Sequence, residues 1–129
     1  MIFDIKMSEN FRRKARLVAD GHKTNTPSTM TYRSVNSNDS IRICLLIAAL
    51  NDLDVLSVDI PNAYLTTPNK EKVYCIAGPE FGFGQGKVMI ITRALYGLKS
   101  AGAAFRYHLA ITLDDMNFKP SRTDPDVWM

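Results

Sequence analysis

Apolar and polar residues alternate in two runs at the start of the chain. The first run is Ile2 to Met7 and the second is Phe11 to Ala19, with the turn-forming residues 8–10 between them. A two-residue period is typical of a β-strand that is buried on one face. In the second run, Lys14 and Arg16 fall on the same face. The pattern therefore predicts a β-hairpin with one basic face.

Helical and strand patterns follow one another along the rest of the chain. Asp39 and Ser40 are residues of the kind that cap helices, and the apolar positions after them predict a helix over 41–51. A second apolar face at helical spacing predicts a helix over 100–116. Strands are expected at 55–60, 72–77, 88–93 and 125–129, and loops at 21–31 and 78–86. Strands mixed with two helices give an α+β fold class.

The composition is that of an ordinary globular domain. The chain has 129 residues, of which 46% are hydrophobic and 22% are charged, so a packed core is expected. The longest apolar run, Ile43 to Leu50, is shorter than the ~20 residues of a membrane span. The N-terminus has no secretion-signal pattern, so we expect no membrane partner and no secretion. Cys44 and Cys75 lie among apolar residues; two buried free thiols are favoured, although a disulfide stays open.

The positive charge is concentrated at the N-terminal end. Residues 1–33 hold seven basic and three acidic side chains, a balance of +4, and the remaining nine basic and ten acidic side chains sum to −1. A localised basic patch favours a phosphate-bearing partner, although a solvated strand face would have the same composition.

Two motifs for other chemistry are incomplete. The run Gly82 to Lys87 is not a phosphate-binding P-loop, because Phe81 replaces the first glycine and Val88 replaces the Ser or Thr. His22 and His108 have no matched nucleophile, which argues against a hydrolase triad.

Three other segments carry a more distinctive pattern. VDIPNAYL places Asp59 at the end of an apolar run and Tyr64 five residues later, RRKARLVA is the basic strand, and RALYGLKSAG precedes the second helix. In this order they resemble the reverse transcriptase of copia-type retrotransposons. Matches at TYRSVNSNDSIR, GPEFG and DPDVWM extend the resemblance along nearly the whole chain.

The resemblance implies a fold and a set of site residues. Residues 1–129 would form the fingers and part of the palm of a right-hand polymerase, as one partial domain. Asp59 would be the first catalytic aspartate and a metal ligand, and Tyr64 would lie under the incoming sugar and exclude a 2′-hydroxyl. The other implied nucleotide-binding residues are Lys14 or Arg16, which would contact the triphosphate, and Tyr96, Gly97 and Lys99.

The implied chemistry suits these residue types. A primer 3′-hydroxyl attacks the α-phosphate of a deoxynucleotide, and two Mg²⁺ ions activate the attacking oxygen and stabilise the leaving pyrophosphate. Magnesium prefers carboxylate oxygens, and basic side chains neutralise the triphosphate. The resemblance therefore implies two Mg²⁺ ions as cofactors. The implied partners are an RNA or DNA template-primer, a deoxynucleotide and the rest of the retroelement polyprotein.

The family carries an aromatic-x-Asp-Asp turn after the strand that begins at Pro125, and this sequence ends at Met129. We therefore expect a fragment that does not polymerise by itself. Its parent would be an RNA-directed DNA polymerase of cytoplasmic virus-like particles, with the nucleus as a second compartment. The alternatives are a decayed or co-opted remnant that only binds nucleic acid through its basic hairpin, and a degenerate reading frame without function.

Overall fold

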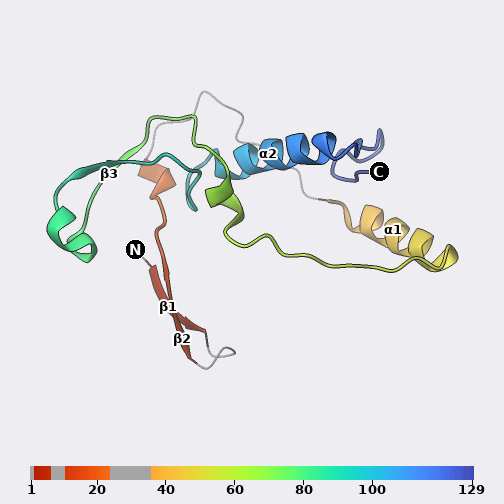
Figure 1. Ribbon diagram of the computed structural model, residues 1–129, viewed down its shortest axis with the longest axis horizontal. Helices are drawn as coiled ribbons and strands as arrows, with labels where there is room; N and C mark the ends of the chain where they lie inside the picture. The colour runs from red at the N-terminus through yellow and green to blue at the C-terminus, as the bar shows by residue number, and fades with distance from the viewer. Residues whose placement is uncertain (1, 7–10, 24–35) are drawn as a thin grey trace.

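The N-terminal hairpin folds as its alternating sequence predicts. The computed structural model describes residues 2–6, 11–23 and 36–129, so the predicted turn at 8–10 and most of the loop at 21–31 lie outside the described residues. Strand β1 (Ile2–Lys6) pairs antiparallel with β2 (Arg12–Arg16), and Asp4 is opposite Lys14. The hairpin projects from the rest of the molecule (Figure 1).

A second antiparallel pair forms in the middle of the chain. Strand β3 (Tyr74–Ile76) pairs with β4 (Val88–Ile90), and the glycine-rich segment between them folds into the 3₁₀ turn Pro79–Gly84. Both strands are shorter than predicted, and the two pairs do not join into one sheet within the described residues.

Both predicted helices are present. Helix α1 (Asn38–Leu50) begins earlier than expected, because the side chain of Ser37, rather than Asp39 or Ser40, accepts a hydrogen bond from the Ser40 main-chain N–H at 3.0 Å. Helix α2 (Ala101–Asp115) agrees with its prediction within a residue at each end. Neither helix is long and apolar enough to cross a membrane, and this holds for the described part of the chain.

Two predictions are wrong. The segment 55–60 is extended but belongs to no strand, because no other described segment pairs with it, and a strand needs a hydrogen-bonding neighbour. Residues 125–129 form only an isolated bridge, Pro120 with Trp128. Cys44 is exposed rather than buried, since no described element covers the apolar face of α1, and Cys75 is only partly buried.

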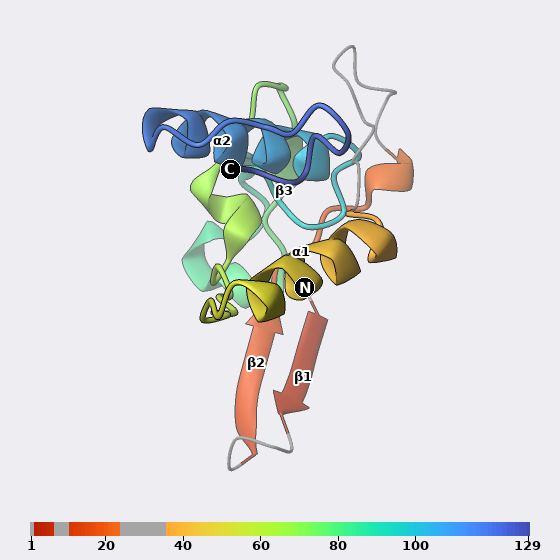
Figure 2. The same cartoon turned by 90° about the vertical axis from the view of Figure 1, so that its right-hand side faces the viewer.

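The core is small and lies beside the start of α2. Its buried apolar side chains are Ala94, Leu95, Leu98 and Ala101, and Ala19, Tyr64, Val73 and Ile91 pack against them. Figure 2 shows the same chain with the hairpin below and α2 above. Helices and small antiparallel sheets around this core make a mixed α+β fold, as the sequence predicts.

A close backbone crossing joins the base of the hairpin to this core. The Ala19 N–H donates to the Tyr96 carbonyl oxygen at 2.7 Å. Gly97 has a φ of 91°, and a Cβ on it would lie 2.0 Å from the Ala19 carbonyl oxygen. Only glycine tolerates both the positive φ and the close approach. The crossing therefore fixes the base of β2 against the loop that precedes α2.

Candidate functional site

The local sequence explains how Asp59 and Tyr64 come to lie close together. Asp59 ends the extended apolar segment, and Pro61 and Asn62 then redirect the chain. Asn62 has a left-handed φ of 53°, a conformation that asparagine tolerates better than most residues. The 3₁₀ turn Ala63–Thr66 follows and packs against α2, which brings Tyr64 to the N-terminal end of that helix.

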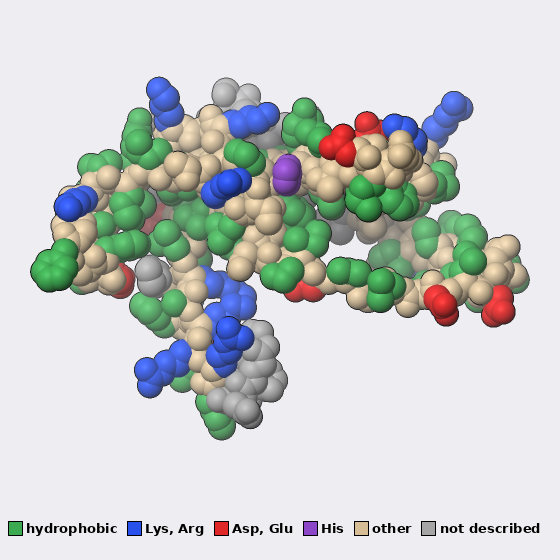
Figure 3. All heavy atoms as spheres, viewed as in Figure 1, with side chains coloured by type: hydrophobic (Ala, Val, Ile, Leu, Met, Phe, Trp, Pro, Cys, Tyr) green, Lys and Arg blue, Asp and Glu red, His purple; other side chains and the backbone are tan. Residues whose placement is uncertain are grey.

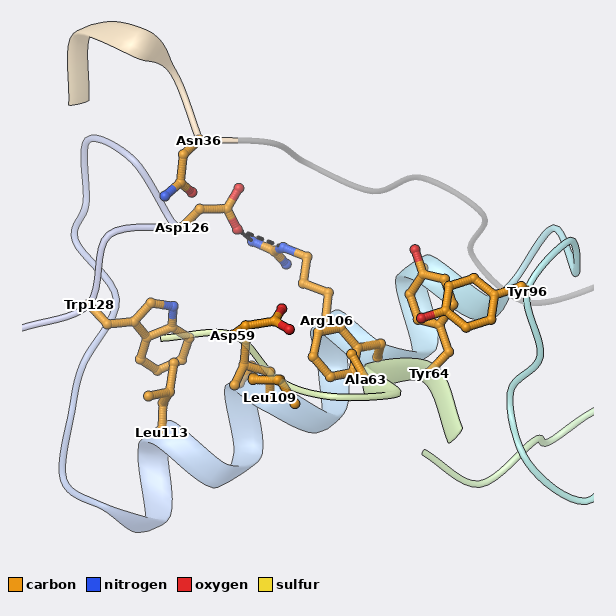
Figure 4. Close-up of a pocket in the computed structure, with 14 residues that line it drawn as sticks. Asn36, Asp59, Ala63, Tyr64, Tyr96, Arg106, Leu109, Leu113, Asp126 and Trp128 are labelled. Carbon is orange, nitrogen blue, oxygen red and sulfur yellow. Dashed lines mark hydrogen bonds and ion pairs between the residues drawn. The ribbon is translucent and has the colours of Figure 1, made fainter. Parts of the chain in front are cut away.

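Asp59 borders a cavity of about 520 Å³ between the 59–64 segment, α2 and the C-terminal segment. Figure 4 shows the Asp59 carboxylate facing the interior of this cavity, which we name the Asp59 cavity. One wall is aliphatic and comes from α2, through Leu109 and Leu113, and Trp128 of the C-terminal segment also lines the cavity. The carboxylate therefore lies next to apolar walls in a space large enough for water and a ligand group.

Three aromatic rings form one end of the Asp59 cavity. The Tyr64 ring lies 4.7 Å from the Tyr96 ring and 6.0 Å from the Phe105 ring, measured between centroids, with the Phe105 pair edge to face. Such pairs contribute about 0.5–1.5 kcal/mol beyond their buried area. Tyr64 is thus held between two rings, and its orientation is defined by them. The sequence indicated the apolar face that carries Phe105 but not this contact.

A second cavity, of about 720 Å³, lies on the other side of Asp59 and reaches the basic strand. Its lining includes Lys14 and Arg16 of β2 together with Asp59 and Tyr96. Figure 3 shows blue cationic side chains gathered near the base of the hairpin. Both candidate triphosphate contacts therefore border the same cavity, and the geometry does not choose between them.

Gly97 and Lys99 are not among the residues that line either cavity. Gly97 lies at the backbone crossing with Ala19, and Lys99 is an exposed residue of the loop before α2. The structure thus brings together Asp59, Tyr64 and Tyr96 with the basic strand, and it places the last two predicted residues outside this group.

An ion pair that the sequence did not predict lies in the Asp59 cavity. The Arg106 guanidinium donates from Nε and from Nη2 to Asp126 Oδ1, each at 2.8 Å. Both residues line the cavity, and they come from α2 and from the C-terminal segment. A contact between residues 20 positions apart has no local sequence signal.

A neighbouring carboxylate ties α1 to the C-terminal segment. The Ser40 hydroxyl donates to Asp124 Oδ2 at 2.5 Å, and the Asp126 main-chain N–H donates to Asp124 Oδ1 at 3.0 Å. These two hydrogen bonds lower the pKa of Asp124 below its ordinary value of 3.8, and the hydrogen bond from Ser40 has the larger effect. Asp124 therefore connects α1 to the C-terminal segment while it is ionised.

The carboxylate oxygens of Asp59 are the kind of ligand that Mg²⁺ prefers. Mg²⁺ keeps several waters in proteins and is usually held through one or two carboxylates together with substrate phosphates. Asp59 offers a carboxylate beside two cavities with room for water. The described residues contain no group of three or more His, Cys, Asp or Glu side chains that could hold a metal by themselves. Asp59 could thus hold the ion only together with water and a ligand.

Comparison with known protein families identifies the chain. The sequence profile of the family described as Reverse transcriptase (RNA-dependent DNA polymerase) matches residues 2–129. The chain therefore belongs to the reverse transcriptase family. Members of this family generally use Mg²⁺ and act on a nucleic-acid template-primer and deoxynucleotides. Among solved structures, none matches the chain.

Proposed function

We propose that this chain is part of the reverse transcriptase of a copia-type retrotransposon. In this proposal, residues 1–129 contribute fingers and palm elements, with Asp59 as a catalytic aspartate. The observation that carries the proposal is that Asp59 borders two adjoining cavities, one lined by Tyr64 and one by the basic strand. A carboxylate, an aromatic wall and cations are what a nucleotide site for phosphoryl transfer requires.

Each residue has a distinct task in the proposed reaction. The primer 3′-oxygen forms a bond to the α-phosphorus, and the bond to the pyrophosphate oxygen breaks. Lys14 or Arg16 neutralises the triphosphate as its charge moves toward the leaving group. The Tyr64 ring, held by its neighbours, occupies the space that a 2′-hydroxyl needs. Asp59, with substrate phosphates, would hold Mg²⁺, which when bound supplies charge stabilisation to both reacting oxygens.

The finer expectations belong to the same proposal. The chain would act as part of a retroelement polyprotein, in cytoplasmic particles and with the nucleus as a second compartment. Tyr96 would contribute to the nucleotide site through its contact with Tyr64. Gly97 and Lys99 would act on the nucleotide only indirectly, since they line neither cavity.

Equilibrium nucleotide binding to the 129-residue chain tests the proposal. Trp128 is the chain's single tryptophan and lines the Asp59 cavity, so its fluorescence reports on occupancy. We expect dGTP to bind more tightly than GTP in the presence of Mn²⁺. Tyr64→Val should reduce this preference, because truncation opens space for the 2′-hydroxyl. Asp59→Asn should remove the Mn²⁺-dependent part of the affinity.

Matched controls separate these roles from general damage. Tyr107→Val truncates an exposed tyrosine of α2 that does not line the cavity, and it should leave the sugar preference unchanged. Asp54→Asn removes an exposed acid from the same segment as Asp59 and should leave the Mn²⁺ dependence unchanged. An unchanged sugar preference in Tyr64→Val, with the protein folded, would refute the role of Tyr64.

One observation favours a second function, simple nucleic-acid binding by the hairpin. Arg12, Arg13 and Arg16 are exposed on β2, and the hairpin projects away from the core. Exposed cations bind phosphate backbones without sequence preference. This function alone would be supported if the chain bound RNA or DNA but no nucleotide, and if Asp59→Asn left the binding of RNA or DNA unchanged.

A further inference from the structure

The ion pair in the Asp59 cavity has a geometry suited to a fixed contact. Two of the three guanidinium nitrogens, Nε and Nη2, reach the same oxygen of Asp126 at 2.8 Å. The Asp126 side chain is only 15% exposed and that of Arg106 is 39% exposed, so water screens the pair less than it would at the open surface. In Figure 4 the guanidinium lies on the side of the cavity that the Asp59 carboxylate faces.

The pair determines how much charge the cavity carries. Three of the described residues that line it have charged side chains: Asp59 and Asp126 are acidic, and Arg106 is basic. Arg106 and Asp126 cancel, which leaves the single negative charge of Asp59. Without the guanidinium the cavity would hold two carboxylates, and without Asp126 it would hold one carboxylate facing an unbalanced cation.

We propose that the Arg106–Asp126 ion pair sets the divalent-cation affinity of the Asp59 cavity. Arg106 is a positioning residue: it holds Asp126 as its own partner and so keeps a second carboxylate from a cation at Asp59. This inference rests on the proposed role of Asp59 as a cation ligand. Its consequence is a cavity that binds a metal ion weakly until a ligand supplies further oxygens, since Mg²⁺ is commonly completed by substrate phosphates.

A purely structural role predicts something different. The pair also ties α2 to the C-terminal segment that carries Trp128. If this tie were its only role, loss of either partner would loosen the same wall, and both changes would alter cation binding in the same direction. An electrostatic role predicts opposite directions, because one change makes the cavity more negative and the other makes it less negative.

Mn²⁺ binding to the full 129-residue chain separates the two roles. Free Mn²⁺ is measured by electron paramagnetic resonance at low ionic strength and neutral pH. Arg106→Gln should tighten Mn²⁺ binding on the order of fivefold, and Asp126→Asn should weaken it by a similar factor, because each variant changes the charge of this partly hydrated cavity by one unit. Arg106→Lys keeps the charge and should stay near the wild type.

The double variant is the matched control. Arg106→Gln combined with Asp126→Asn removes both charges, so its affinity should return to the wild-type value although the ion pair is gone. It also keeps the test decisive if one single variant fails to fold, because neither position then carries a charge that has lost its partner. Tb³⁺ luminescence excited through Trp128 confirms that the ion binds beside this indole, since the chain has one tryptophan.

The outcomes distinguish this inference from the proposed function. If Asp59→Asn leaves Mn²⁺ binding unchanged, Asp59 is no cation ligand and the proposed function fails. The other case is that Asp59→Asn abolishes Mn²⁺ binding. This inference is then overturned, and the ion pair is only a structural tie, if Arg106→Gln and Asp126→Asn shift the Mn²⁺ affinity in the same direction. It is also overturned if the affinity of the double variant stays far from that of the wild type.

Discussion

Replacing Gly97 with alanine should strongly destabilise the protein. A φ of 91° disfavours any side chain, at a cost of about 1–2 kcal/mol for an L-residue in the left-handed region. The new Cβ would also lie 2.0 Å from the Ala19 carbonyl oxygen, so the two backbones must separate. Separation breaks the 2.7 Å hydrogen bond from Ala19 to Tyr96, a loss of about 0.5–1.5 kcal/mol. Together these effects lower the free energy of unfolding by about 1.5–3.5 kcal/mol.

Urea unfolding, followed by circular dichroism and Trp128 fluorescence, measures this loss as a lower midpoint. Gly86→Ala is the matched control, because Gly86 has a φ of 78° but no atom within 4 Å of the position that a Cβ would take. The loss of stability in Gly86→Ala should reflect the backbone strain alone. Gly21→Ala tests the crossing from its other side, where a Cβ would lie 1.9 Å from the Gly97 carbonyl oxygen. If Gly97→Ala were no more damaging than Gly86→Ala, the crossing would not be a tight structural contact.

Two further predictions concern charge. The affinity for RNA and DNA should fall steeply with added salt, as expected for roughly 3–4 phosphate contacts. Neutralising the basic residues of β2 should lower both this affinity and its dependence on salt. An unchanged salt dependence would mean that these residues form only a solvated face. The lowered pKa of Asp124 means that its ionised form stabilises the fold above the ordinary value of 3.8, and this contribution is lost as the pH falls through the lower folded-state pKa. Asp124→Asn should therefore reduce stability at neutral pH, and its difference from the wild type should shrink in acid; a difference that is constant with pH would contradict this.

Local patterns predicted the elements that form locally. The hairpin needs only two adjacent runs and a short connection, and α2 needs only its own hydrogen bonds and an apolar face. The segment 55–60 has the composition of a strand, yet a strand depends on a neighbour that local sequence does not name. The start of α1 was misplaced because several residues near it can cap a helix, and only the Ser37 side chain reaches the Ser40 N–H.

The candidate site shows the same division. Asp59, Tyr64 and Tyr96 were identified through a resemblance between short motifs, and they do lie around adjoining cavities. Phe105 and the Arg106–Asp126 pair were not identified, because their roles arise from contacts between distant segments. Gly97 lies at a backbone crossing, as its φ and its surroundings show, and its expected place at the nucleotide stays a prediction.

The position of the core has a consequence for the order of folding. The buried side chains come from the segment 94–101, and Ala19 and Tyr64 pack against it from much earlier in the chain. During synthesis the hairpin can form early, but it has nothing to pack against until this segment leaves the ribosome. Contacts between segments so far apart in sequence carry a loop-closure cost and slow folding. The base of the hairpin should therefore gain protection from hydrogen exchange late in refolding, together with the loop before α2 rather than with the hairpin's own strands.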